Sequence, residues 1–374
     1  MIRLVAAIRK EFLQFLRDWL LVALVVFIYT ADLIICTSAL SFDVRNLKLA
    51  VYDGDRSQLS GKLVERFTAS SYFGKLISVA RLSELDRLLD ASKADLALVI
   101  PDGFSRAAEA GRTAEVLVLL AGTNANTANA ARGYAATIVG GFSRDMLLRH
   151  AAQHGITVNL PSVEPEIRIW YNPQLEFAHF MAVSMIVSAA LMVGVITAAA
   201  GLVREKESGT IEQLVVTPLR SHEVIIAKAA PPFTIGMFAL VPSLWIARAF
   251  GVPLAGNLSF FIIASAIALS AFLAIGFFIG TLAKNLQQAL LLAFFVLFPL
   301  LFLSGTISPI ESAPAVIQWL SLFSPVRYYM EIALGILLKG VGIDVLWPQL
   351  TALSGTGLVL GAWSVARLRK QFYM

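Results

Sequence analysis

The residues best suited to carry chemistry lie in one short, charged segment between two apolar stretches. The segment Arg204–Leu219 begins with four alternating charges and ends just beyond Thr217-Pro218. Thr210 and Gln213 have the spacing of a capping box, in which the hydroxyl accepts a backbone N–H and the amide reaches back. The residue before a proline is disfavoured in a helix. The pattern therefore predicts a helix of under two turns, from about Ile211 to Val216.

This helix indicates recognition rather than catalysis. It would expose Ile211, Leu214 and Val215 as an apolar face, and so short a helix is unstable in water unless something packs on it. A rigid helix beside the membrane is suited to receive force from a motor protein. The motor must be a separate subunit, because no Gly-x-x-x-x-Gly-Lys-Ser/Thr phosphate-binding loop occurs in the sequence. A capped loop without a partner is the simpler alternative.

A second group of ionisable residues falls in or beside the apolar stretches. A carboxylate inside a membrane costs several kcal/mol unless it faces protein or water. Asp32 is therefore expected to line a pathway or to be paired, unless it lies at the interface. The candidates for a translocation pathway are Asp32, Glu176, His179, Glu311, Arg327 and Glu331. For the last three, local ion pairs in an interfacial cap are an equally good interpretation.

The sequence predicts neither a catalytic set nor a metal site. His150 and His154 have the spacing of a helical ligand pair, but no third ligand is placed nearby. Neither a Gly-x-Ser-x-Gly turn nor a His-Glu-x-x-His motif occurs. The single cysteine, Cys36, excludes an internal disulfide. We expect no enzyme activity and no cofactor bound by this chain.

The elements that must position these residues are mostly membrane spans. Of the 374 residues, 57% are apolar and only 15% are charged, which excludes an ordinary soluble protein. A span needs about 20 mostly apolar residues. The runs that qualify are Trp19–Ser41, Phe177–Val203, Ile225–Phe250, Leu258–Ala283, Gln288–Ser304 and Leu346–Arg367. The expected fold class is an α-helical integral membrane protein with six transmembrane helices.

Basic residues near the span ends predict the orientation. They concentrate on the side of the N-terminus, which places both termini and the loop 204–222 in the cytoplasm. Residues 1–18 have the spacing of an amphipathic helix in the cytoplasmic interface. Residues 19–41 form the first transmembrane helix, and residues 368–374 form a cytoplasmic tail. A cleaved signal peptide, or a helical extension of the first span, is the alternative for the N-terminal segment.

Residues 43–173 differ in composition and are expected to form an extracytoplasmic α/β domain between the first and second spans. The expected strands are Leu47–Tyr52, Leu96–Ile100 and Val116–Leu120. The expected helices are Ser57–Phe67, Ser83–Ala91 and a third that runs through about His150. Asp53-Gly54-Asp55 is expected to be a turn at the end of a strand rather than a calcium site.

Residues 177–367 hold the remaining five spans, the loop 204–222 and an outer hairpin over 305–345. Within this hairpin, Pro314–Phe323 and Val326–Leu338 are apolar but too short to span a membrane. Such lengths are typical of re-entrant or interfacial helices.

The segment Arg204–Pro218 resembles the signature of permease subunits of type-2 ABC exporters, in the group similar to bacterial multidrug-efflux permeases with a large periplasmic domain. The resemblance extends over essentially the whole chain. Further segments that carry it are Ile8–Phe12, Asp53–Ser57, Val99–Phe104, Ser304–Ser312 and Leu338–Gly342.

The resemblance implies that the helix around Ile211–Val216 is a coupling helix that docks on an ATP-binding subunit. The contact residues it implies are Arg204, Glu205, Glu207, Gly209, Thr210, Glu212 and Gln213. It also implies a bacterial inner membrane, a second permease in a homodimer or heterodimer, and ATP and Mg²⁺ bound by the partner subunit. Members often use a periplasmic adaptor and an outer-membrane channel. Drugs or other lipophilic compounds are the substrates it favours, and no nucleic-acid partner is expected.

Two other functions fit parts of the sequence. An ion-coupled secondary transporter would need several ionisable residues within its spans, whereas Asp32 stands almost alone there. A membrane-anchored binding or assembly protein would use residues 43–173 but would need neither six spans nor the capped loop.

Overall fold

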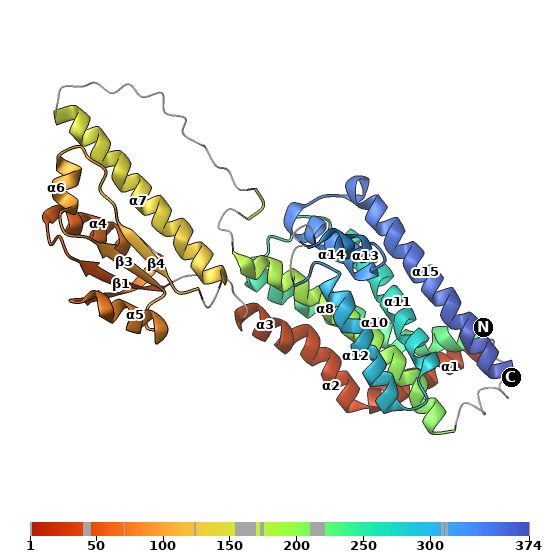
Figure 1. Ribbon diagram of the computed structural model, residues 1–374. Coiled ribbons are helices and arrows are strands. Elements are labelled where there is room, and N and C mark those ends of the chain that lie inside the picture. The colour runs from red at the N-terminus through yellow and green to blue at the C-terminus, as the bar shows by residue number, and fades with distance from the viewer. Residues whose placement is uncertain are drawn as a thin grey trace. The chain divides into compact units, whose positions relative to one another are not determined.

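The computed structural model describes residues 2–39, 46–70, 72–122, 125–153, 170–172, 176–209, 221–307, 310 and 313–373. Contacts divide the chain into two compact units (Figure 1). One is Phe42–Ile167, which we call the sheet unit. The other combines Met1–Ser41 with Arg168–Met374, and we call it the helical unit.

The described part of the sheet unit contains a four-stranded sheet. Its strands are β1 (Leu47–Asp53), β2 (Phe73–Val79), β3 (Leu96–Ile100) and β4 (Leu117–Leu120). Their order is β2-β1-β3-β4, with β1 parallel to β2 and β3, and β4 antiparallel to β3. Its helices are α4 (Gln58–Thr68), α5 (Leu82–Asp90), α6 (Phe104–Glu109) and α7 (Ala125–Gln153).

The central strands are apolar along most of their length because both faces of the sheet are covered. Leu49 and Leu98 face a core shared with α4, α6 and α7. Ala50 and Ala97 point to the opposite face, where they pack with Leu85 of α5. Figure 1 shows α5 on one side of the sheet and α4 and α7 on the other. The sheet unit is thus a three-layered α/β structure.

The strands predicted as β1, β3 and β4 and the helices predicted as α4, α5 and α7 are confirmed, close to their predicted ends. Strand β2 was missed. It lies at the edge of the sheet, and only Phe73 among its residues is fully buried. An edge strand with Lys75 and an exposed Leu76 lacks the alternating pattern by which a half-buried strand is recognised.

The helical unit begins with α1 (Ile2–Arg17). A helix then follows as α2 (Trp19–Phe27), the π-helical turn η1 (Ile28–Asp32) and α3 (Leu33–Ala39). The long helices are α8 (Phe177–Glu207), α10 (Ser221–Ala249), α11 (Leu258–Leu282), α12 (Leu286–Phe302) and α15 (Ile343–Tyr373). Helix α10 continues through Pro231, Pro232 and Pro242.

Helix α8 is the most buried of these candidate spans. Of the residues in its most apolar 18-residue stretch, 83% are buried, against 11% for α15. Glycines bring it close to α11. A Cβ added at Gly276 would lie 2.4 Å from the carbonyl oxygen of Val195, and one at Gly194 would lie 2.7 Å from the Cβ of Phe272. Such close packing of small residues is typical of helices in membranes. A displacement of α8 must therefore displace α11 as well.

Five of the described helices are long and apolar enough to cross a membrane, whereas the sequence predicts six. The difference is α12, which has 17 residues and so extends for about 26 Å. It ends at Phe302 because the chain turns there, and the hydroxyls of Ser304 and Thr306 donate to the carbonyl of Leu301 at 2.6 and 3.1 Å.

The outer hairpin contains two short helices, α13 (Ala315–Ser321) and α14 (Pro325–Leu334). A second π-helical turn, η3 (Gly335–Lys339), continues α14. The two helices separate between the two predicted apolar runs, where Ser324 is the N-cap residue of α14 and Pro325 is its first residue.

Candidate coupling site at the end of α8

The loop predicted to carry the function leaves the end of α8 and returns at the start of α10. Residues 210–220, and with them Thr210, Glu212, Gln213 and the helix predicted over Ile211–Val216, lie outside the described residues. Both flanks of the loop are described. We call this end of the helical unit, where α8 ends and α10 begins, the loop end.

The last turn of α8 is tied to its surroundings by each of four consecutive residues. Arg204 forms an ion pair with Asp18, whose carboxylate also caps α2 by accepting from the N–H of Leu21. Lys206 donates to the carbonyl oxygens of Gly280 at 2.7 Å and Ala283 at 3.1 Å. These carbonyls belong to the end of α11, where a cation is favourable.

Glu207 completes the set at the start of another helix. Its carboxylate accepts from the N–H of Leu286, the first residue of α12, at 2.8 Å. Consecutive helical residues point about 100° apart. Four of them in a row can therefore reach neighbours all round the helix, as they do here.

Glu205 is the most buried member of the turn, with 2% of its surface exposed. Its carboxylate lies 2.8 Å from the ammonium of Lys228 in α10 and 3.2 Å from that of Lys10 in α1. Lys228 in turn lies 3.3 Å from Glu11. These two lysines and two glutamates form a formally neutral group, which we call the charge cluster. It links α1 to both helices that flank the loop.

The pKa values of Lys10 in α1 and of Asp18, which caps α2, are shifted in the directions that these pairs require. Burial is the largest single influence on Lys10 and would lower its pKa, but the carboxylates of Glu205 and Glu11 together raise the pKa above the usual value. The hydrogen bond from Arg204 lowers the pKa of Asp18. Both groups are therefore charged at neutral pH.

Gly209 ends α8 with a positive φ of 68°, a conformation that glycine adopts without strain. It is exposed, as is Glu207. The contact residues implied by the sequence therefore fall into two groups. Glu205 is buried in the helical unit and Arg204 is part-exposed but paired with Asp18, whereas Glu207 and Gly209 lie at the surface.

The pathway candidates do not form one group. Asp32 ends the π-helical turn of the first span and accepts a hydrogen bond from the thiol of Cys36 at 3.6 Å. His179 is buried, and its Nε2 lies 3.4 Å from the carboxylate of Glu176. Glu176 and His179 are thus brought together at the start of α8, whereas the bond of Asp32 stays within its own helix.

The remaining candidates lie in the outer hairpin. Arg327 donates to Glu331 at 2.9 Å and to the carbonyl of Gln318 at 3.3 Å, and it also donates to the hydroxyl of Ser321. The bonds to Gln318 and Ser321 join α13 to α14, whereas the ion pair with Glu331 lies within α14 and agrees with local ion pairing. Glu311 lies outside the described residues.

Sequence reasoning placed residues 1–18 on the side of the loop but missed the ion pairs that Lys10, Glu11, Asp18 and Lys228 form at the loop end. Lys228 offered a signal, because a lysine inside an otherwise apolar run needs a partner. Among the described residues, no group of three or more His, Cys, Asp or Glu could hold a metal ion. His154, the second member of the predicted pair, lies outside them.

Comparison with known proteins bears on the whole chain. Residues 17–366 match the family described as ABC-2 family transporter protein. The chain is 31% identical over 366 residues to the inner membrane transport permease YhhJ of Escherichia coli K12, covering 96% of this chain and 95% of the relative. It is 29% identical over 373 residues to the probable multidrug ABC transporter permease YbhR of the same organism, covering 99% of each. The chain therefore belongs to the ABC-2 family of transporter proteins and is a permease of that family.

Proposed function

We propose that the chain is the membrane-spanning permease subunit of an ATP-driven exporter, and that a separate ATP-binding subunit docks on the loop 204–222. The observation that carries the proposal is the set of bonds made by the last turn of α8. Immediately before the loop, it bonds to the α1–α2 junction, α10, α11 and α12. A force applied to the loop would therefore reach these helices without an intervening flexible segment. ATP and Mg²⁺ would be bound by the partner subunit.

The loop residues would divide into two roles. Arg204 and Glu205 are positioning residues that hold the end of α8 through Asp18 and the charge cluster. Glu207 and Gly209, which are exposed, would contact the ATP-binding subunit together with Thr210, Glu212 and Gln213.

The proposed topology counts α12 as a span, giving six in the inner membrane, with both termini in the cytoplasm. The distribution of basic residues supports this orientation, since Lys206, Lys228 and Arg367 lie at the loop end. The domain over 43–173 would then be extracytoplasmic. A second permease, identical or different, would complete the transporter, and an adaptor and outer-membrane channel would extend it where the cell envelope has two membranes.

Drugs or other lipophilic compounds are the proposed substrates, because relatives are named as probable multidrug permeases. Transport would proceed by alternating access, with closure of the ATP-binding subunits pushing on α8 and opening the outer side. Asp32 and the pair of Glu176 and His179 are the proposed polar points on the pathway. Arg327, Glu331 and Glu311 are proposed to shape its outer exit.

Co-purification tests the docking site. The chain is expressed together with a candidate ATP-binding subunit, and the recovered complex is quantified. A Glu212→Ala/Gln213→Ala variant is expected to lose most of the bound subunit, because the contacts implied for the loop are removed. A matched double variant in the sheet unit, Glu84→Ala/Asp86→Ala, should retain it. Equal recovery from both variants would exclude this part of the loop as the docking site.

A further inference from the structure

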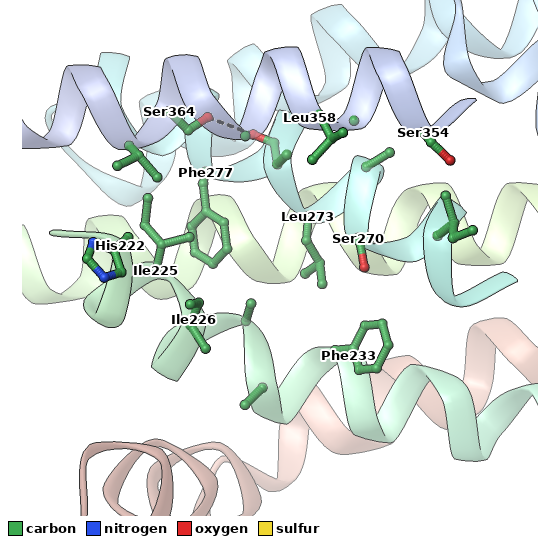
Figure 2. Close-up of a pocket in the computed structure, with 18 of the residues that line it drawn as sticks. His222, Ile225, Ile226, Phe233, Ser270, Leu273, Phe277, Ser354, Leu358 and Ser364 are labelled. Carbon is green, nitrogen blue, oxygen red and sulfur yellow. Dashed lines mark hydrogen bonds between the residues drawn. The ribbon is translucent and has the colours of Figure 1, made fainter. Parts of the chain in front are cut away.

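A cavity of about 730 Å³ lies between α10, α11 and α15, apart from the charge cluster (Figure 2). Small residues create the hollow, among them Ala230 of α10, Ala271 and Ala274 of α11 and Gly361 of α15. The volume is within the range of small-molecule sites, roughly 300–1,000 Å³. The question is which ligand chemistry the walls accept.

The polar side chains inside the cavity leave no hydroxyl proton for a ligand. Ser270 donates to the carbonyl of Ala266 at 2.8 Å, and Ser354 donates to that of Leu350 at 2.8 Å. Ser364 donates to the carbonyls of Ala274 at 3.0 Å and Leu360 at 2.8 Å. Apart from His222 at one end, every other lining residue is apolar or glycine. Since a buried polar group needs a partner, the walls favour hydrocarbon.

The cavity follows the helices for the depth of about one leaflet. On α10 it extends from His222 to Phe233, or about 17 Å at the rise of an α-helix. The hydrocarbon core of a bilayer is about 30 Å thick, so one leaflet contributes about half of that. Ile226 and Leu358, which line the cavity, are 50% and 74% exposed, so its side is open toward the surrounding lipid.

The mouth at the loop end is cationic. Helix α15 continues beyond the cavity with Arg367, Arg369 and Lys370, all exposed. Lys206 lies close enough to Arg367 for their charges to interact. Outside the formally neutral charge cluster, the described acidic residues that flank this end include Glu223, next to His222 on α10, and Glu207, next to Lys206 on α8. The four basic side chains outnumber these two carboxylates, which favours an anionic headgroup over a zwitterionic one.

We propose that the cavity holds an acyl chain of one anionic phospholipid from the leaflet at the loop end, with its phosphate at the mouth formed by His222 and the cationic end of α15. This proposal requires only that the helical unit lies in a membrane, and it does not rest on the proposed export function. It would stabilise the packing of α15, the least buried of the candidate spans, against α10 and α11.

Native mass spectrometry of the purified full-length chain with phosphatidylglycerol and phosphatidylcholine tests this site. A Gly361→Leu variant fills the cavity. A Cβ at Gly361 has only an ordinary contact, at 3.9 Å from Ala274, so the fold should tolerate it. The matched control is Gly355→Leu, on the same helix but outside the cavity lining. We expect one retained phosphatidylglycerol per chain in the wild type and the control, and retention lower by about tenfold in Gly361→Leu.

A second variant distinguishes recognition of the lipid headgroup from binding of the acyl chain. Arg367→Gln/Arg369→Gln should bind both lipids equally, because the preference for the anion is lost while the apolar cavity remains. Equal retention in wild type and Gly361→Leu would overturn the site. So would a wild type that prefers phosphatidylcholine. The third test uses Leu358→Cys in a Cys36→Ser background. A disulfide between two copies of this variant would show that a second permease covers the cavity, and it would likewise overturn the lipid proposal.

Discussion

Single residues at the loop end show how a sequence motif and its structural role can differ. The resemblance groups Arg204, Glu205, Glu207 and Gly209 as contacts for a partner, yet Glu205 is almost wholly buried between Lys10 and Lys228. The motif indicates which residues matter, but not which way each side chain points. That direction is decided by partners far away in the sequence.

The charge cluster gives a stability prediction. Glu205→Ala leaves Lys228 buried without its closest carboxylate, and breaking a buried pair in this way costs about 3–5 kcal/mol. We expect a marked fall in the thermal unfolding midpoint of the chain in detergent or nanodiscs. Glu207→Ala is the comparison: it removes one exposed hydrogen bond to Leu286 and leaves no buried charge, so it should lower the midpoint much less.

The double variant Glu205→Ala/Lys228→Ala refines this test. Removing both members of the pair should be less harmful than the sum of the two single changes, because no isolated charge remains buried. Equal midpoint shifts for Glu205→Ala and Glu207→Ala would contradict an anchoring role for the cluster.

Asp55 gives a pH prediction in the sheet unit. Hydrogen bonds from Ser57 and Ser105 hold the pKa of its carboxyl below the ordinary 3.8. It also accepts from the N–H of Gly103 at 2.9 Å and that of Ser105 at 3.1 Å, at the start of α6. Because the folded pKa is the lower one, the stabilisation is fully present above pH 3.8 and is lost as the pH falls through the folded value.

Hydrogen exchange by pulse labelling after equilibration between pH 6 and pH 3 measures this effect. Protection of α6 should fall at the acid end in the wild type. It should be lower and nearly independent of pH in Asp55→Asn, while Asp86→Asn on α5 behaves as the wild type. A pH dependence unchanged by Asp55→Asn would assign the acid sensitivity to another group.

At the scale of elements, the sequence predicts what depends on local pattern and misses what depends on neighbours. The long apolar helices and the buried strands β1 and β3 follow from composition and length. Strand β2 lies at the edge of the sheet. It is a strand because it pairs with β1, and its own residues do not show a strand pattern. The π-helical turn that ends at Asp32 has no comparable sequence signature, yet such turns are frequent at functional sites.

The outer hairpin offers a prediction at this scale. Helix α13 has only seven residues, too few to be stable alone, and Arg327 of α14 holds it through Ser321 and the carbonyl of Gln318. Arg327→Ala should speed hydrogen exchange in α13 by about tenfold, since hydrogen bonds from charged groups are worth about 1.5–3 kcal/mol.

The control for the hairpin is Glu331→Gln. It removes the ion pair of Arg327 but leaves its two bonds to α13 in place, so exchange should change much less. If both variants exchange alike, the i, i+4 pair rather than the link between helices sets the stability of the hairpin.

At the scale of the whole molecule, the chain joins two units with different cores. In the sheet unit, strands are buried between helices. In the helical unit, the largest apolar core is built around α8. The composition of residues 43–173 predicted a separate region, and its alternating strand and helix signals predicted an α/β structure. The sequence could not predict that α8 is the centre of the helical unit, because α8 is no more apolar than α11 or the first candidate span and only packing distinguishes them.

The central position of α8 supports the proposed mechanism, in which force enters through the loop at its end and spreads to the helices bonded to its last turn. In this mechanism the chain does not act alone, and the loop, rather than the sheet unit, receives the partner.

Transport of a lipophilic dye by reconstituted vesicles tests this most directly. Vesicles with the chain and its ATP-binding subunit should move the dye only when ATP is hydrolysed, and Glu212→Ala/Gln213→Ala should abolish both transport and the stimulation of hydrolysis. Vesicles holding the chain alone should move none. ATP-independent movement of dye against a gradient by the purified chain alone would contradict the account.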